Sequence, residues 1–112
     1  MAALVDRAVA RAALEAERGR LLAALAEPIE GPGQMTYGSQ AAAATHFFEQ
    51  QRDLALRERA RAQLEQVEAA LARLDAGTYA TCTSCGRPIA AERLEAIAWT
   101  LLCIDCARTA SR

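Results

Sequence analysis

Apolar residues recur along the first part of the chain at helical spacings. From Ala3 to about Ala26 the sequence is rich in Ala, Leu, Arg and Glu, which favour helix. Leu14, Leu21 and Leu25 return to one face of this segment. Pro28 then ends the pattern, because a proline cannot continue a helix. The pattern predicts a first helix about 36 Å long at 1.5 Å per residue.

A second, longer helix is predicted from Gln40 to about Asp75, roughly 50 Å in length. The apolar positions of its C-terminal half alternate spacings of four and three residues, as in a heptad seam. Gly77 follows as the glycine expected just past a helix end. The seam residues are Ala60, Leu64, Val67, Leu71 and Leu74.

The segment between the two helices, about 28–39, concentrates glycine and proline and is predicted to be a loop, with Ser39 as the N-cap of the second helix. A dimerising coiled coil would satisfy the same periodicity. Closing a loop of about a dozen residues costs little entropy, however, so the helix–loop–helix order favours an intramolecular hairpin. We therefore expect a mainly α protein built on an antiparallel coiled-coil helical hairpin.

The only four cysteines form two Cys-x-x-Cys pairs, Cys82 with Cys85 and Cys103 with Cys106, and 17 residues separate the pairs. Two such pairs supply the four thiolates of a tetrahedral Zn²⁺ site. All four ligand positions are then filled by the protein, which is typical of a structural zinc and not of a catalytic one. The spacing predicts a small C-terminal four-cysteine zinc-finger module with one Zn²⁺.

Other roles of the cysteines are less favoured. Disulfides need an oxidising compartment, whereas residues 1–7 lack the apolar core of a signal peptide, so we expect a cytoplasmic protein. A thioredoxin-like site would use one pair at a strand-to-helix turn, whereas two matched pairs are present here. A thiol switch that releases zinc is the third alternative.

Length and charge set further limits. The chain has 112 residues and a formal charge of −1, which four thiolates and one Zn²⁺ would bring to about −3. A generic nucleic-acid binder would be basic. No run of 18 apolar residues predicts a membrane span. We expect residues 1–76 to form the hairpin and residues 77–112 the zinc module, which is too short to fold without metal.

Residues around the cysteines and in the second helix form more specific motifs. Segment 77–96 reads Gly-Thr-Tyr-Ala-Thr-Cys-Thr-Ser-Cys-Gly-Arg-Pro-Ile-Ala-Ala-Glu-Arg-Leu-Glu-Ala, and segment 103–106 reads Cys-Ile-Asp-Cys. Together they resemble the signature of the DksA/TraR family of bacterial zinc-finger proteins. Segment 45–56, Thr-His-Phe-Phe-Glu-Gln-Gln-Arg-Asp-Leu-Ala-Leu, resembles the Thr-x-x-Phe-Glu-Arg-x-x-Asp-Leu stretch of long-hairpin members.

The resemblance implies a transcription regulator that is not an enzyme. Such proteins bind RNA polymerase by inserting a helical hairpin into its secondary channel, with a structural zinc at the base of the hairpin. They often act together with guanosine tetraphosphate. The resemblance thus predicts RNA polymerase as the partner. The intramolecular hairpin predicts a monomer, the lack of a long apolar run predicts no membrane association, and the acidic balance predicts no sequence-specific DNA binding.

The sequence departs from the family at three places. Ala80 stands where the family usually has Gly, and Ala98 where it usually has Pro. Active members carry aspartates at the hairpin tip, whereas residues 31–48 here contain no Asp or Glu. The candidate partner contacts at this neutral tip are Gln34, Met35, Tyr37 and Gln40.

Several residues near the cysteines and the tip have two interpretations. Arg87, Arg93 and Arg108 are expected to offset the charge of the zinc centre, with a phosphate contact as the alternative. Trp99 is expected to join a small core between the zinc site and the base of the hairpin, with a partner contact as the alternative. His46, the only histidine, is expected to be an ordinary surface or packing residue, with a tip ligand or pH sensor as the alternative.

Two further functional classes remain as alternatives. One is a zinc finger that binds nucleic acid directly, which the acidic balance disfavours. The other is an interaction or assembly protein built on an intermolecular coiled coil. An enzyme is the least supported class, because the predicted zinc has no vacant position and no nucleophile–base pair is present.

Overall fold

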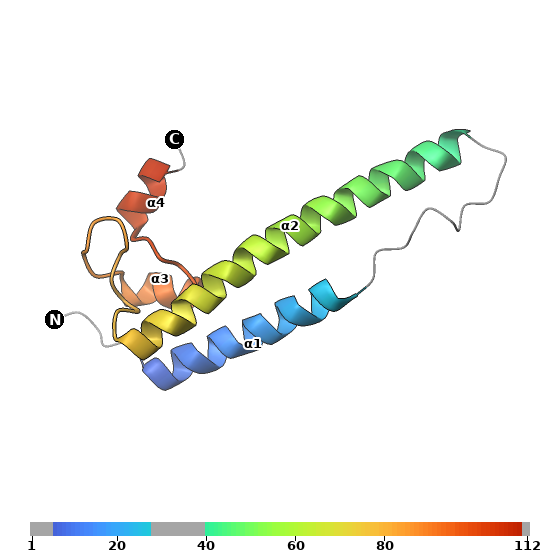
Figure 1. Cartoon of the computed structure of the whole chain (residues 1–112). Helices are drawn as coiled ribbons and strands as arrows, with labels where there is room; N and C mark the ends of the chain where they lie inside the picture. Colours follow the sequence, from blue (N-terminus) through green and yellow to red (C-terminus); the bar gives the residue numbers. More distant parts are fainter. Residues whose placement is uncertain (1–5, 28–39, 111–112) are drawn as a thin grey trace.

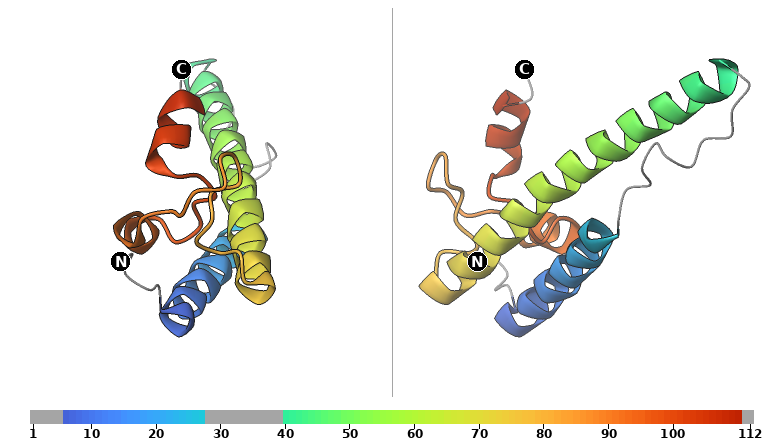
Figure 2. Two further views of the ribbon diagram at one scale, coloured as in Figure 1. Left: turned by 90° about the vertical axis from the view of Figure 1, so that its left-hand side faces the viewer. Right: turned by 45° about the vertical axis from the view of Figure 1, so that its right-hand side comes forward.

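The computed structural model describes residues 6–27 and 40–110. These residues contain four helices and no strand beyond an isolated bridge between Thr81 and Pro88. Two long helices lie side by side and run in opposite directions, and two short ones lie beside the C-terminal end of the longer helix (Figures 1 and 2). The molecule measures 67 × 31 × 19 Å. The predicted helical hairpin is confirmed. In chain order the helices are α1 (Arg7–Ala26), α2 (Gln40–Ala76), α3 (Ala91–Ala96) and α4 (Ile104–Ala110).

Helix α1 begins at Arg7 and not at Ala3 as the composition suggested. Asp6 is the N-cap: its backbone is extended, and its carboxylate accepts hydrogen bonds from the amides of Ala8 and Val9 at 2.9 and 3.2 Å. These bonds satisfy donors that the first helical turn leaves unpaired, which fixes the start of the helix. The helix ends at Ala26, as predicted.

Helix α2 ends in the manner expected from Gly77, which has a φ of +81°. The amide of Gly77 donates to the carbonyl of Leu74 at 3.3 Å, and the amide of Thr78 donates to the carbonyl of Arg73 at 2.9 Å. This pair of bonds is the Schellman motif, in which a left-handed residue satisfies the last carbonyls of the helix. The predicted C-terminal glycine is confirmed.

Polar contacts between α1 and α2 set their register. Arg11 pairs with Asp75 at 2.6 Å, and Gln63 donates to Glu17 at 2.6 Å, so the start of α1 lies beside the end of α2. At the other end of α1, Arg57 donates to the carbonyl of Leu25 at 3.1 Å. The last turn of α1 therefore lies opposite the middle of α2.

Helix α2 consequently projects well past the end of α1. Its residues 40–56, named here the distal arm, lie beyond the contact at Arg57 and extend about 25 Å at 1.5 Å per residue (Figure 1). Helix α1 itself has 20 residues and is about 30 Å long, not 36 Å. The described helices thus pair along about half of α2. The loop predicted at 28–39 and the N-cap Ser39 lie outside the described residues.

One hydrophobic core joins the base of the hairpin to the C-terminal module. The seam residues Val67 and Leu74 are fully buried, as expected, and so is Leu14 of α1. Trp99 is partly buried against this core, as the sequence predicted. The buried members of the cluster are Ala10, Leu14, Leu21, Val67, Ala70, Leu74, Tyr79, Cys82, Ile89 and Leu94.

The hydroxyl of Tyr79 donates to the carbonyl of Ala98 at 2.8 Å and links the start of the C-terminal module to the segment between α3 and α4. The division of the chain into residues 1–76 and 77–112 stays a prediction.

Among the described residues, no helix combines the length and the apolar character that a membrane crossing requires.

Candidate metal centre

The first cysteine pair lies on a tight turn that directly follows the end of α2. The amide of Cys82 donates a hydrogen bond to the carbonyl of Arg87 at 2.8 Å, and the amide of Gly86 donates one to the carbonyl of Cys82 at 3.0 Å. Gly86 has a φ of +75°, a conformation that glycine adopts without the steric cost of a side chain. The turn therefore presents Cys82 and Cys85 on the same side.

The second pair lies at the start of α4. Cys103 directly precedes the helix, and its carbonyl accepts from the amide of Ala107 at 2.9 Å. A hydrogen bond of 2.9 Å from the amide of Thr83 to the carbonyl of Leu101 ties this segment to the first turn. Cys106 is on the first turn of α4, so the two pairs face each other.

The four sulfur atoms gather into one cluster. The Sγ atoms of Cys82, Cys85, Cys103 and Cys106 all lie within 4.8 Å of one another. The distance between Cys85 Sγ and Cys103 Sγ is 3.7 Å. Tetrahedral ligands with Zn–S bonds of about 2.3 Å lie about 3.8 Å apart, whereas a disulfide requires about 2.05 Å. The geometry fits a four-thiolate zinc site.

The electrostatics of the cluster also favour the binding of a cation. Without metal, backbone N–H groups of Cys103 and Cys85 stabilise the Cys82 thiolate and lower its pKa to about 6. Hydrogen bonding with Cys103 raises the pKa of Cys106 to about 12. Thiols this close cannot all ionise alone, because each thiolate disfavours the next. A dication removes that conflict, since its charge stabilises all four thiolates together.

Two arginines outside the sulfur cluster hold its backbone in place. Arg93 of α3 donates from Nε to the carbonyl of Leu102 at 2.9 Å and from Nη2 to Thr100 Oγ1 at 3.3 Å. These contacts fix the segment that leads into Cys103. Arg73, in the last turn of α2, donates to the carbonyl of Thr78 at 2.6 Å and to that of Thr81.

Arg73 was missed by the sequence analysis. The signal for it was a basic residue in the last turn of a helix, where the free carbonyls of the helix end attract cations.

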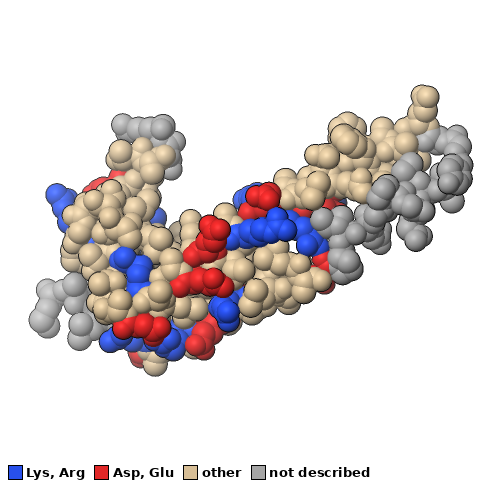
Figure 3. All heavy atoms as spheres, in the orientation of Figure 1, with Lys and Arg blue, Asp and Glu red and all other residues tan. Residues whose placement is uncertain are grey.

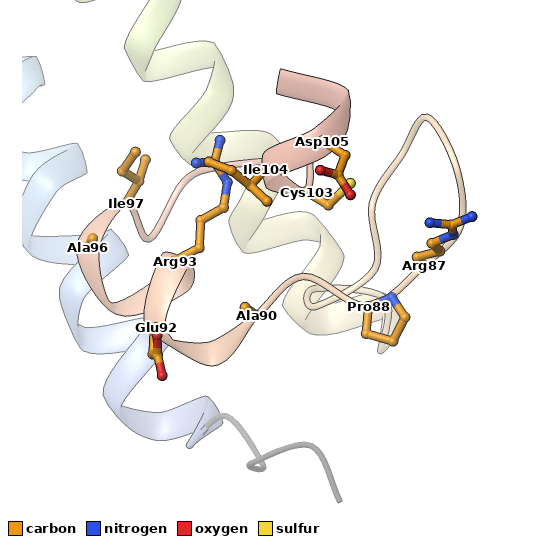
Figure 4. A pocket seen from close by; sticks show the side chains of 10 residues that line it. All are labelled: Arg87, Pro88, Ala90, Glu92, Arg93, Ala96, Ile97, Cys103, Ile104 and Asp105. Atoms are coloured by element: carbon orange, nitrogen blue, oxygen red, sulfur yellow. The ribbon is translucent and has the colours of Figure 1, made fainter. Parts of the chain in front are cut away.

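A cavity of about 470 Å³ lies beside the centre, between the first turn, α3 and α4. Arg87 and Arg93 both line it but lie well apart and do not converge (Figure 4). Glu92 and Asp105 line it as well, so its charges balance. This arrangement does not favour the phosphate contact considered for these arginines. Arg108 faces Asp105 at 4.0 Å on the surface.

The candidate tip contacts lie far from the metal centre. Gln40 is exposed at the first residue of α2, at the opposite end of that helix from the cysteines (Figure 1). Gln34, Met35 and Tyr37 lie outside the described residues. His46 is part-buried on the distal arm and is no part of the sulfur cluster.

Comparisons with known proteins agree on one family. Residues 77–112 match the prokaryotic dksA/traR C4-type zinc finger. The chain is 41% identical over 51 residues to an uncharacterized protein of Aquifex aeolicus, which covers 46% of this chain and 35% of that protein. It is also 41% identical over 54 residues to the RNA polymerase-binding transcription factor DksA of Haemophilus influenzae. These 54 residues are 48% of this chain and 37% of that protein.

The likeness extends to the fold. The solved structure of transcription factor DksA2 from Pseudomonas aeruginosa matches with a TM-score of 0.55 and 28% sequence identity, covering 94% of this chain and 74% of that one. The matched segments of the two sequence relatives span only about a third of their length. The finger signature and the four clustered thiols coincide with a long helical hairpin like that of DksA2, and residues 77–112 therefore form a zinc finger of the DksA/TraR family, with one structural Zn²⁺.

Proposed function

We propose that this protein is a transcription regulator that binds RNA polymerase and inserts its helical hairpin into the secondary channel. The observation that carries the proposal is the likeness to DksA proteins in both sequence and fold. One relative is described as an RNA polymerase-binding transcription factor, and the DksA2 structure matches over 94% of this chain. The proposal applies that function to the present chain.

The shape of the molecule supports insertion of one end. The distal arm is a single helix that extends about 25 Å past α1, whereas the base carries α3, α4 and the metal centre (Figure 2). The described part of this end is one helix, about 10–12 Å wide with its side chains, which suits a narrow pore. The broader base would remain outside, on the rim of the channel.

In this proposal the zinc stiffens the base and takes no part in chemistry. Its ligands would be Cys82, Cys85, Cys103 and Cys106, which leave no position for substrate. Cys82 is buried in the same core as Leu74, so the metal braces the C-terminal end of α2 directly. A base held in this way sets the direction in which the distal arm points.

The tip of the hairpin would make the contacts inside the channel, through Gln34, Met35, Tyr37 and Gln40. These residues are neutral, so we do not propose that they bias the polymerase Mg²⁺ through carboxylates. Guanosine tetraphosphate is the candidate co-ligand at the joint interface of this chain and polymerase. The protein would act as a cytoplasmic monomer.

A pull-down of core RNA polymerase by the zinc-loaded protein tests the proposal. We expect the wild type to retain polymerase and a variant with residues 33–40 replaced by a Gly/Ser stretch of equal length to retain much less. A variant in exposed residues of the base, Glu95→Gln with Arg108→Gln, is the matched control. Equal retention by the tip variant would refute insertion, and no retention by the wild type would refute polymerase binding.

A DNA gel shift at low salt separates this function from direct nucleic-acid binding. Phosphate contacts strengthen as salt falls, so a DNA-binding zinc finger would shift DNA under these conditions. We expect no shift up to protein concentrations at which polymerase is saturated.

A further inference from the structure

The distal arm carries the largest exposed apolar side chains of α2. Phe48 is 69% exposed, Phe47 55% and Leu54 48%, although all three are large and apolar. The two rings touch edge to face, with their centroids 5.9 Å apart. In a monomer these groups face water, which costs free energy in proportion to the apolar area.

These side chains form one broad face of the helix. Successive residues are rotated by about 100° around the helix axis. Seen along this axis, Leu54 lies about 20° to one side of Phe47, and Phe48 lies about 100° to the other side. The three side chains therefore span an arc of about 120°. Between and beside them stand only alanines and glutamines, at positions 40, 41, 43, 44, 51 and 55. Of the charged residues of the arm, Glu49 and Asp53 lie on the opposite side, and Arg52 borders the face about 40° beyond Phe48. An apolar face wider than about 100° is the kind that faces a core.

Helix α1 does not cover this face. Among the polar contacts between the described helices, the one nearest to the arm is made by Arg57, which lies about 80° from Phe47 around the helix and away from Phe48. Leu56, also exposed, is on the far side among the charged residues and belongs to no patch. The arm thus presents a core-type face without a core in the described part of the chain.

Charge is distributed unevenly over the molecule. Residues 31–48 contain no Asp, Glu, Lys or Arg. On the face drawn in Figure 3, charged side chains gather along the middle and are scattered over the base, and the described part of the distal end has none. The ion pairs Arg11–Asp75, Arg18–Glu68 and Arg61–Glu58 all lie on the proximal side of the arm. A charged surface would find no complementary partner on the distal face.

A second copy of the chain fits this face poorly. A helix pair built on a coiled-coil seam uses a narrow stripe of two positions in seven, so pairing through Phe47 and Leu54 would leave Phe48 in water. A stable interface also buries about 800 Å² per partner. The two phenylalanines, of about 200 Å² each and already covered by between a third and a half, provide much less. A groove that wraps the helix buries all three side chains.

We propose that the distal arm lies in an uncharged, apolar groove of its protein partner. Phe47 and Phe48 are the anchoring residues, and Leu54 enters the groove about two helical turns further along. This is helix-in-groove recognition, in which apolar side chains on one face of a helix, here Phe47 and Leu54 at i and i+7 with Phe48 beside them, enter a hydrophobic cleft. It rests on the proposed function, in which the partner is RNA polymerase. Binding by this face is apolar and therefore nearly independent of salt.

Binding of the full-length, zinc-loaded protein to core RNA polymerase tests the proposal. The protein carries a fluorophore on its N-terminal amine, and anisotropy gives Kd at salt concentrations from about 50 mM to about 500 mM. We expect the wild-type Kd to change less than about threefold over this range, whereas several phosphate-like or ionic contacts would change it by orders of magnitude.

The variant Phe47→Ala/Phe48→Ala should raise Kd about 100-fold, because anchoring aromatic residues dominate the energy of such interfaces. Val9→Ala and Ile104→Ala are matched controls, since these exposed apolar residues lie on α1 and α4; both should leave Kd within about twofold. Circular dichroism of the double variant should match the wild type, because neither ring belongs to the core cluster.

Each result has a defined meaning. An unchanged Kd for Phe47→Ala/Phe48→Ala, or a steep salt dependence of the wild type, overturns the groove while leaving polymerase binding intact. Failure of the wild type to bind polymerase refutes the proposed function and with it the partner named here. Sedimentation that shows a dimer lost in the double variant assigns the face to self-association instead.

Discussion

Leu14→Ala is the substitution that best probes the packing of the hairpin base. Leu14 is fully buried, and it shares one cluster with Val67 of α2 and with Tyr79 and Leu94 of the C-terminal module. Truncation to Ala removes three buried carbon atoms and leaves a cavity. Leucine-to-alanine changes at such sites cost about 3–5 kcal/mol.

The expected loss is a large part of the total stability, which is about 5–15 kcal/mol for a domain. With a urea m-value of about 2 kcal/mol/M, a loss of 3 kcal/mol lowers the unfolding midpoint by about 1.5 M. Leu22→Ala is the matched control, because Leu22 lies on the same helix but is 41% exposed. Alanine is a strong helix former, so the control should shift stability by less than about 1 kcal/mol.

Two probes followed during the same urea titration show whether the core is shared. Circular dichroism reports on the long helices, and the fluorescence of Trp99, the only tryptophan, reports on the C-terminal module. Because Leu14 and Trp99 pack on one cluster, both midpoints should fall together. Equal effects of Leu14→Ala and Leu22→Ala would refute the packing. A Trp99 midpoint that did not move would show that the module does not depend on the hairpin core.

Further predictions address the metal, the helix cap and pH. Cys85→Ser, or chelation, should unfold the C-terminal third and leave substantial helix; unchanged thermal melting together with no zinc by metal analysis would contradict a structural zinc. Asp6→Ala should lower the free energy of unfolding by about 1 kcal/mol, because it removes the N-cap of α1. Asp6→Asn should lower it by much less, because asparagine caps helices as aspartate does. Equal losses for the two variants in urea titrations would exclude capping. The hydrogen bond from Arg20 lowers the pKa of Glu17. The contribution of ionised Glu17 to the free energy of unfolding is therefore present above the ordinary Glu pKa, and it is lost as the pH falls through the lowered value. Glu17→Gln should therefore reduce the loss of stability on acidification, which melting curves from about pH 6 to about pH 3 would measure.

Much of this architecture follows from short-range patterns in the sequence. The heptad spacing located Val67 and Leu74 in the core, and Gly77 marked the end of α2. The cysteine spacing anticipated the sulfur cluster, because a Cys-x-x-Cys turn needs only local backbone geometry to bring two thiols together. Such features depend on residues a few positions apart.

Features that depend on where two distant segments meet were not predictable. Propensity continues without a break through the first residues, so the start of α1 depended on the side chain of Asp6. The length of the distal arm depends on the register of α1 against α2, which ion pairs such as Arg11–Asp75 report only in three dimensions. Helices α3 and α4, of 6 and 7 residues, are too short for a periodic signal and depend on the turns around the cysteines.

The most direct test of the proposed function is competition for RNA polymerase. The zinc-loaded protein is bound to core polymerase, and a protein known to occupy the secondary channel is added in increasing amounts. We expect the bound fraction to fall to background as the competitor saturates the channel. Binding that persists at saturating competitor would place this protein elsewhere on polymerase, and the absence of any binding would contradict its proposed role as a polymerase regulator.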